Sequence, residues 1–446
     1  MSARFNRVLL PNLFFEEELQ SSMKVASTNA RRVAAELGPV MGLLELEHLA
    51  ADVTPDDRSH QRSIVLVSEE ARPDGVPPAL QGIEFLTIDE LAAIVAQESQ
   101  TDPGNATVRE AVPWGWSDAA VNAFQNASVG FDAPDPDVVR LINGRQFQEK
   151  FDMAVEIDGE ERRDSFGTLC WSLPEVMAAI SNVDDYSQRG WVIKAELSHA
   201  SRNRLLGTSR KCSDEQRVWL AARFASGECV YVEPWVERIS ECGLQFTVKK
   251  SSHAVPLIQF VGATEMLTDE TGRYRGSVVR ASPHGSATQD SDWQPAIDHC
   301  RQIAEAAAKQ GYFGPLGIDC MVYRCPKDNQ RWFRLAHDIN GRLTMGRVAL
   351  SLRRWLKPGE TGFWMHTTAD FSLQNGNKID EDSCSGVRII PTSPCRIGGR
   401  ATKIRTELFA ASNPDRLNAI RMQIRGESAK MRDFSVNATM SCTKIV

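Results

Sequence analysis

The pattern of apolar and polar positions predicts a parallel sheet in the first part of the chain. Short apolar runs rich in β-branched residues predict strands at residues 7–13, 64–68 and 83–87. Helical segments follow at residues 21–36 and 88–98. Strands that alternate with helices are typical of a sheet with crossover helices, so we expect a Rossmann-like first domain. No G-x-G-x-x-G sequence follows these strands, so a dinucleotide site is not indicated.

The pattern changes after residue 131. A run of acids and prolines at residues 132–137 predicts a linker, because proline cannot continue a helix or a central strand. Strands are expected further on at residues 191–195, 230–236, 387–391 and 403–409, and helices at residues 213–226, 292–310 and 413–426. We therefore expect a multidomain protein of mixed α/β and α+β class.

The composition is that of an ordinary globular protein. Of the 446 residues, 42% are hydrophobic and 24% are charged, and the length suits two or three domains. The formal net charge of -7 gives no electrostatic reason to expect nucleic acid or an anionic membrane as a partner.

Cysteine usage and the amino terminus indicate the compartment. The ten cysteines include no C-x-x-C pair and no nearby Cys/His tetrad, so zinc is not expected. Several lie in apolar runs, where a free thiol is a small core residue. We see no secretory segment, and no stretch has the roughly 18 uninterrupted apolar residues of a membrane span. We expect a reduced, cytoplasmic protein.

The most informative segments lie in the second half of the chain. An apolar strand at residues 317–323 carries one carboxylate, Asp319, and a second strand ends in Asp338, Asn340 and Arg342. Such oxygen ligands suit Mg²⁺, which takes one or two carboxylates together with nucleotide phosphates. Arg342 would lie where negative charge develops in phosphoryl transfer. Asn340-Gly341 is also a strong hairpin signal, so a simple turn is the alternative.

Two earlier segments carry candidate nucleotide contacts. Lys194 ends an apolar strand before a loop rich in Ser and Arg, which would supply donors to polyphosphate oxygens. The alternative is a lysine that reaches solvent. Another strand ends in Glu233-Pro234-Trp235, where the backbone would meet an adenine edge and Glu233 or Glu237 would hold ribose hydroxyls. Pro234 equally fits a strand at the rim of its sheet.

Taken together, these segments resemble the ATP-grasp family. Their order is a lysine strand with a lid loop, a hinge with a glutamate, a strand with an aspartate, and an acid-x-Asn-x-Arg segment. The resemblance covers roughly residues 140–350. It implies an ATP-grasp fold with these domains: a Rossmann-like preATP domain at 1–137, a lid at 138–240, a metal-binding part at 241–375 and an extension of unknown role at 376–446.

The resemblance also implies the roles of individual residues. The implied ATP contacts are Lys194, Ser198, Arg202, Arg204, Glu233, Trp235, Val236, Glu237 and Arg145, the last as a candidate second phosphate-binding cation. The implied Mg²⁺ ligands are Asp319, Asp338 and Asn340, and the implied catalytic groups are Arg342 and Arg280.

The implied reaction is a ligation that consumes ATP. A substrate carboxylate attacks the γ-phosphate, and an amine intercepts the resulting acyl phosphate. The cofactors would be ATP and Mg²⁺, and the partners small-molecule carboxylates and amines, with homo-oligomerisation left open.

Some positions depart from the family pattern. Asp338 stands where most members have Glu, and Gly341 where Pro is frequent. The lid has Ser201 and Asn203 where glycines are common. These departures leave open a protein that binds nucleotide but turns it over slowly. The alternative function is a non-catalytic regulatory protein that binds ATP or ADP.

Overall fold

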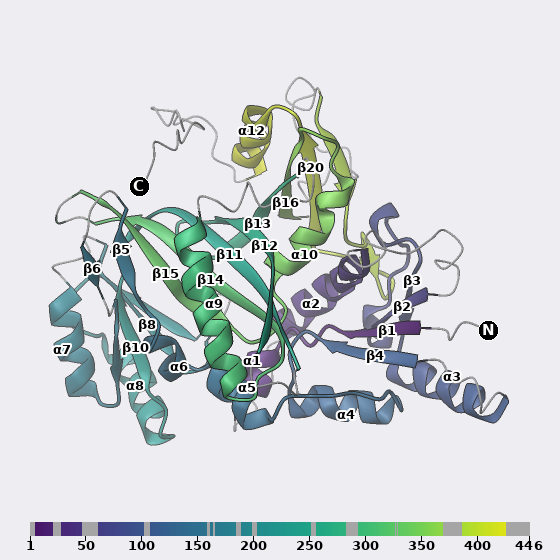
Figure 1. The fold of residues 1–446 in the computed structure, drawn as a ribbon, viewed down its shortest axis with the longest axis horizontal. Helices are drawn as coiled ribbons and strands as arrows, with labels where there is room; N and C mark the ends of the chain where they lie inside the picture. Colours follow the sequence, from purple (N-terminus) through teal and green to yellow (C-terminus); the bar gives the residue numbers. More distant parts are fainter. Residues whose placement is uncertain are drawn as a thin grey trace.

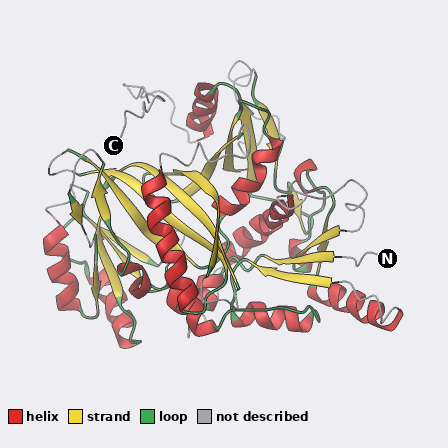
Figure 2. Ribbon diagram, viewed as in Figure 1, coloured by secondary structure: helices red, strands yellow, loops and turns green. Residues whose placement is uncertain are grey.

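The computed structural model describes most of the chain. The described segments are residues 5–20, 28–46, 61–101, 108–157, 161–163, 166–183, 189–198, 203–250, 256–281, 293–325, 327, 329–368 and 386–424. Within these segments the strands form four sheets, and helices cover their faces (Figure 2). None of the helices described there is long and apolar enough to cross a membrane.

The amino-terminal sheet is parallel, as the alternation of strands and helices predicts. Its order is β3-β2-β1-β4, and every neighbouring pair is parallel. The strands are β1 (Phe5–Leu10), β2 (Gln61–Leu66), β3 (Ile83–Leu86) and β4 (Val108–Pro113). The helices are α1 (Phe15–Glu18), α2 (Thr28–Leu37), α3 (Ile88–Thr101) and α4 (Asp118–Asn126), with 3-10 turns at Gly38–Leu46, Glu69–Ala71 and Pro78–Leu80. The expected Rossmann-like sheet is confirmed, although β4 was not predicted.

The proline-rich linker is shorter than its composition indicates. Helix α5 (Pro136–Asn143) already begins inside it, with Asp135 as N-cap, and α6 (Arg145–Glu149) follows. The Asp135 side chain accepts a hydrogen bond from the amide of Asp137. Proline at the first helical position needs no amide partner, so Pro136 starts the helix that it was expected to prevent.

A small antiparallel sheet forms a separate layer with its own core. Its order is β7-β10-β8-β9, and its helices α7 and α8 lie at the opposite end of the molecule from the amino-terminal sheet (Figure 1). The strands are β7 (Thr168–Cys170), β8 (Trp191–Ala195), β9 (Arg204–Gly207) and β10 (Val230–Pro234), and the helices are α7 (Leu173–Val183) and α8 (Asp214–Ala225). Ser213 and Gln216 form a reciprocal capping box that fixes the start of α8. We call this layer the lid sheet.

A ten-stranded sheet occupies the centre of the molecule. Its order is β17-β20-β16-β13-β12-β11-β14-β15-β5-β6, and all its pairings are antiparallel. The strands are β5 (Ala154–Glu156), β6 (Arg162–Arg163), β11 (Glu237–Lys249), β12 (Leu257–Thr268), β13 (Tyr274–Arg280), β14 (Gly314–Arg324), β15 (Arg331–Asn340), β16 (Thr361–Thr368), β17 (Arg388–Pro391) and β20 (Ile404–Ala411). The strands β18 (Arg396–Ile397) and β19 (Arg400–Ala401) pair separately.

Four helical segments pack on or beside this sheet. They are α9 (Gln294–Lys309), α10 (Met345–Ser351), a 3-10 turn at Leu352–Trp355 and α12 (Pro414–Ile424). Helix α9 crosses the face of the sheet (Figure 1). It buries residues at helical spacing, namely Ala296, Ile297, Cys300, Ile303, Ala304 and Ala307, because one apolar stripe of the helix faces the strands.

The carboxyl-terminal region is part of the central sheet. Strand β20 pairs along its whole length with β16, and β17 pairs with β20. Phe409 of β20 is 1% exposed, and it packs with Phe363 of β16 and Leu417 of α12. In residues 386–424, the described part of this region, β17 and β20 therefore belong to the central sheet and α12 packs on it.

The strand pair β14 and β15 decides between the two interpretations of Asn340-Gly341. Strand β15 ends at Asn340, and the next element is helix α10, not a strand. The amide of Gly341 donates to the Asn143 side chain at 2.9 Å. The hairpin alternative is therefore wrong at this position.

Candidate active site

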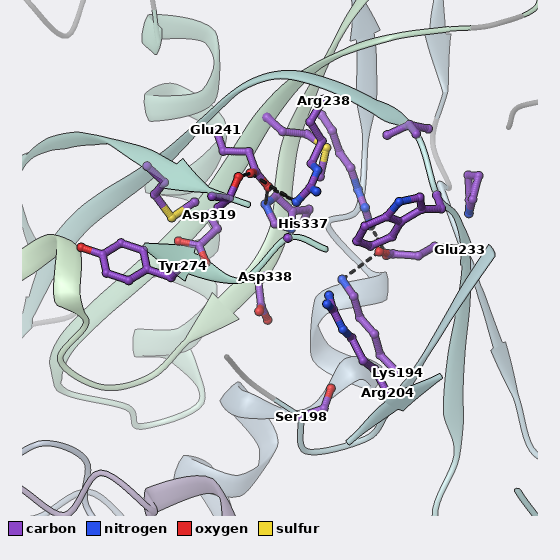
Figure 3. A pocket seen from close by; sticks show the side chains of 18 of the residues that line it. Lys194, Ser198, Arg204, Glu233, Arg238, Glu241, Tyr274, Asp319, His337 and Asp338 are labelled. Atoms are coloured by element: carbon purple, nitrogen blue, oxygen red, sulfur yellow. Dashed lines mark hydrogen bonds and ion pairs between the residues drawn. The ribbon is translucent and has the colours of Figure 1, made fainter. Parts of the chain in front are cut away.

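A pocket opens between the lid sheet and the central sheet, and charged side chains from both line it (Figure 3). The lining residues are Arg145, Lys194, Ser198, Arg204, Glu233, Pro234, Trp235, Val236, Arg238, Glu241, Met266, Thr268, Gly272, Tyr274, Asp319, Met321, Arg334, His337 and Asp338. Five cations and four carboxylates thus share one hollow. Such a mixture suits a ligand that carries several negative charges together with a metal ion.

The two predicted metal-binding aspartates lie side by side. Asp319 of β14 is directly opposite Asp338 of β15 in the antiparallel ladder. Burial, and next the charge of Asp338, raise the pKa of Asp319 to about 8. Cross-strand neighbours on one face are within contact distance, so a like-charged pair is unfavourable without a cation. The geometry therefore supplies two carboxylate ligands at one point.

Asn340, by contrast, is already engaged. It is 3% exposed, and its Oδ1 accepts a hydrogen bond from Arg342 Nη2 at 2.9 Å. Arg342 also donates to Glu16 of α1 and, at 2.8 Å, to the carbonyl of Leu343. Neither Asn340 nor Arg342 lines the pocket. In this conformation Arg342 connects the end of β15 to the amino-terminal domain.

The donor set fits one kind of metal ion. Among the described residues, no group of three or more His, Cys, Asp or Glu side chains is arranged to hold a metal. Two carboxylates are too few for zinc or calcium, but they are what Mg²⁺ uses when nucleotide phosphates and water complete its shell. The pair Asp319 and Asp338 is therefore compatible with Mg²⁺ bound together with a nucleotide.

Lys194 and Glu233 meet inside the pocket. Strand β8 pairs with β10, and Lys194 of β8 is opposite Tyr231 of β10. The Nζ atom of Lys194 lies 2.8 Å from Oε1 of Glu233, which is also on β10. Burial lowers the pKa of Lys194, and Glu233 opposes that shift. The alternative of a solvent-exposed lysine is wrong, since the side chain is 12% exposed.

Arg334 is a pocket residue to which the sequence analysis gave no role. Its guanidinium donates to both oxygens of Asp152, at 2.8 and 2.6 Å, and to Glu233 at 2.8 Å. It also stacks over the Phe166 ring at 4.1 Å. Arg334 is fully buried, and an arginine within an apolar strand was the signal that could have identified it.

Arg145 connects the lid to the metal-binding strands. Its Nη1 lies 2.7 Å from Asp338 Oδ1, and its Nη2 donates to the carbonyl and the hydroxyl of Ser198 at 2.6 and 3.1 Å. Two residues predicted separately, Arg145 and Ser198, are thus in direct contact at the pocket wall.

The hinge tryptophan is flanked by two arginines. Arg204 of β9 and Arg238 of β11 lie over the Trp235 ring, at 5.4 and 4.8 Å from its centre. Arg204 also donates to the carbonyl of Thr271 in the turn between β12 and β13. Trp235 and its neighbour Val236 both line the pocket.

The remaining predicted residues lie elsewhere. Glu237 is exposed at the start of β11, and Arg280 is exposed at the end of β13, where it pairs with Glu265 at 3.2 Å. Neither lines the pocket. Arg202 and Ser201 lie outside the described residues.

Two further pocket residues, Glu241 and His337, have no role in the sequence analysis. Glu241 of β11 is 6% exposed and accepts hydrogen bonds from Thr268 and Arg238. His337 of β15 faces the same space (Figure 3). The long strand β11, which positions Glu241, was not anticipated from the sequence.

Comparison with known proteins establishes the fold. No family model and no curated protein sequence matches this chain. A solved ADP complex of N5-carboxyaminoimidazole ribonucleotide synthetase matches with a TM-score of 0.50 and 11% identity, over 96% of this chain and 98% of that one. N5-carboxyaminoimidazole synthetase from Staphylococcus aureus matches with a TM-score of 0.52 and 10% identity, over 95% of this chain and 97% of that one. The protein has the ATP-grasp fold, which confirms that prediction.

The coverage bears on the carboxyl-terminal region. The uncovered 4% of this chain amounts to about 18 residues, fewer than the 71 residues from 376 to 446. The match therefore extends into that region, of which residues 386–424 are described. At identities near a tenth, the likeness concerns the fold and leaves the reaction to be argued from the site.

Proposed function

We propose that the protein is an ATP-dependent ligase that activates a substrate carboxylate as an acyl phosphate, which an amine then intercepts. The observation that carries this proposal is the pair Asp319 and Asp338, opposed on adjacent strands inside a pocket rich in cations. The solved structures with the same fold support it, since one of them is a synthetase in complex with ADP.

The cations of the pocket would bind the phosphates. Lys194 and Arg145 each hold an ion pair with a pocket carboxylate, and both would exchange part of that contact for a phosphate oxygen. Arg204 lies on the lid side of the same space. Phosphoryl transfer depends mainly on positioning and charge neutralisation, which such a set supplies.

Asp319 and Asp338 would hold Mg²⁺. The ion would neutralise charge on the nucleotide phosphates when bound. Relief of the repulsion between these carboxylates favours its binding, because the raised pKa of Asp319 reports that repulsion together with burial. Asn340 would become a third Mg²⁺ ligand only after its Oδ1 gives up the hydrogen bond from Arg342.

The base and sugar would lie against the hinge. Trp235 and Val236 border the pocket where the chain leaves β10. For the ribose hydroxyls we assign Glu241 in place of Glu233 and Glu237. Two cations hold Glu233 at 2.8 Å each, and Glu237 is exposed. Glu241 is buried at the pocket wall, and among the described residues a single cation, Arg238, holds it at the longer distance of 3.4 Å.

For the transferred phosphoryl group we retain Arg342. Its guanidinium would have to exchange Glu16 for a phosphoryl oxygen, which links catalysis to a rearrangement at the amino-terminal domain. Arg280 receives no role, because it lies outside the pocket. The amine nucleophile, the domain limits and a cytoplasmic location are retained as proposals.

The test is ADP release in the presence of carboxylate and amine mixtures. Asp319→Asn and Asp338→Asn should each lower turnover by orders of magnitude while the melting temperature stays near that of the unchanged protein. Asp298→Asn, on the exposed face of α9, is the matched control and should turn over normally. Unchanged turnover in both pocket variants would refute the proposal.

One observation favours a second candidate, a regulatory protein that binds nucleotide without turning it over. The predicted catalytic Arg342 is held by Glu16, Asn340 and Leu343 and does not line the pocket. Such a protein would bind ATP or ADP tightly, and no carboxylate and amine pair would stimulate ADP release.

A further inference from the structure

His337 enters the pocket through an irregularity of β15. Asp319 opposes Asp338, but Met321 opposes Arg334, so three residues of β15 face the single residue Cys320 of β14. In a regular strand His337 would point away from the face of Asp338, since adjacent side chains alternate. The bulge brings both side chains to the pocket.

The bulge is held in place from outside the strand. Gln148 of α6 donates to the His337 carbonyl at 2.8 Å, and the Leu335 amide donates to the Met153 carbonyl at 2.9 Å. The orientation of His337 is therefore built into the fold and does not depend on a flexible end of the strand.

The imidazole of His337 has unmet hydrogen-bonding capacity. Both ring nitrogens are buried, and neither makes a hydrogen bond with any residue that the structure describes. The carboxylate oxygen Glu241 Oε1 is 4.0 Å from Nε2, which is beyond hydrogen-bonding distance. Either ring nitrogen of an imidazole can carry a proton and donate a hydrogen bond.

The 4.0 Å gap defines what fits beside the ring. An oxygen atom at about 2.8 Å from both His337 Nε2 and Glu241 Oε1 would accept from the imidazole and donate to the carboxylate. With the proton on Nε2, a group that both donates and accepts satisfies the two partners, and a hydroxyl is such a group. A phosphate oxygen would be repelled by Glu241.

We infer that His337 is a specificity-determining residue of the nucleotide pocket, which donates a hydrogen bond to a ribose hydroxyl that Glu241 accepts. This inference rests on the proposed function, because it takes the ligand to be a nucleotide. It explains why both nitrogens of a buried histidine lack partners among the described residues.

The experiment measures Mg-ATP, 2′-deoxyATP and 3′-deoxyATP binding by calorimetry to the unchanged protein and to His337→Leu. The unchanged protein should lose roughly three- to tenfold in affinity for one of the deoxy analogues. His337→Leu should lose a similar factor for ATP and no longer distinguish that analogue from ATP. His337→Gln, which keeps an N–H donor, should retain part of the discrimination.

The melting temperature separates this role from a purely structural one. Without nucleotide, His337→Leu should melt above the unchanged protein, because two unsatisfied buried nitrogens are removed. His366→Leu removes a buried histidine nitrogen of the same kind on β16, outside the pocket, and should leave ATP affinity unchanged. The same ATP-binding and melting measurements are made on His337→Ala, so that the inference can still be tested when His337→Leu does not fold.

Two outcomes overturn the inference while sparing the proposed function. One is ATP binding by His337→Leu with unchanged affinity, and the other is equal binding of ATP and both deoxy analogues by the unchanged protein. Absence of any nucleotide binding to the unchanged protein is a different result, which refutes the proposed function itself.

Discussion

At the scale of single residues, the pocket is organised by buried ion pairs. Arg334 holds Asp152 and Glu233, and Glu233 also holds Lys194. A buried pair costs desolvation energy, and its members are kept only when each charge is matched. The charges of this network are therefore matched within the protein.

Arg334→Met should be strongly destabilising. It leaves Asp152 and Glu233 buried with fewer compensating charges, which typically costs about 3–5 kcal/mol. Urea unfolding measures this loss. The control, Arg280→Met, removes an exposed pair with Glu265 and should cost no more than about 1 kcal/mol. Similar losses in the two variants would contradict the importance given to the buried network.

Some residues of the site could be predicted from the sequence, and others could not. Lys194, Asp319 and Asp338 stand out because each is a charge in or beside an apolar strand, and all three line the pocket. His337 could not be predicted, because regular alternation places it on the other face and a bulge is a property of the paired strands. Arg342 was predicted from its motif, but its contact with Glu16 could not be predicted, because the two residues are 326 positions apart in the sequence.

At the scale of elements, the turn between β12 and β13 closes the side of the pocket that faces the lid. Arg238 donates to the carbonyls of Asp269 and Glu270, and Arg204 of the lid donates to the carbonyl of Thr271. The turn thus connects the central sheet to β9 beside the Trp235 ring.

Gly272→Ala tests the role of this turn. Gly272 has φ +75°, and an added Cβ would lie 2.5 Å from Arg238 Nη1 and 3.1 Å from the Trp235 ring. Gly227→Ala is the matched control, with φ +74° and open space around it. Each should lose about 1–2 kcal/mol to backbone strain. Only Gly272→Ala should also weaken ATP binding in calorimetry, and equal affinities would argue against Trp235 and Arg238 as nucleotide contacts.

The elements themselves were predictable to different degrees. Strand β8 and helix α8 were expected within one residue of their ends, because a short apolar run and a capping Ser213 are local signals. Strands β11 and β12 were missed, since their sequences mix glycine, glutamine and charges with apolar residues. Their pairing is decided by neighbouring strands distant in the sequence.

At the scale of the whole molecule, the central sheet unites regions that the sequence analysis treated separately. The ATP-grasp fold was predictable because several motifs occurred in the right order, each in a suitable context. The place of the carboxyl-terminal region was not, because no motif marks β17 and β20 and their partners are other strands of the sheet.

Phe409→Ala tests whether this region is integral to the fold. Phe409 is 1% exposed among Phe363, Met365 and Leu417, so its truncation should cost about 3–5 kcal/mol in urea unfolding. Met422→Ala on the exposed side of α12 is the control and should cost much less. Equal and small effects would mean that residues 386–424 add little to the stability of the core.

The most direct test of the central claim is calorimetric titration of ATP with Mg²⁺ and with EDTA. The account predicts that the unchanged protein binds ATP at least roughly tenfold more tightly with Mg²⁺, about 1.4 kcal/mol, and that Asp319→Asn and Asp338→Asn lose this metal dependence. Binding that is equally tight with Mg²⁺ and with EDTA, or metal dependence that survives in both variants, would contradict it.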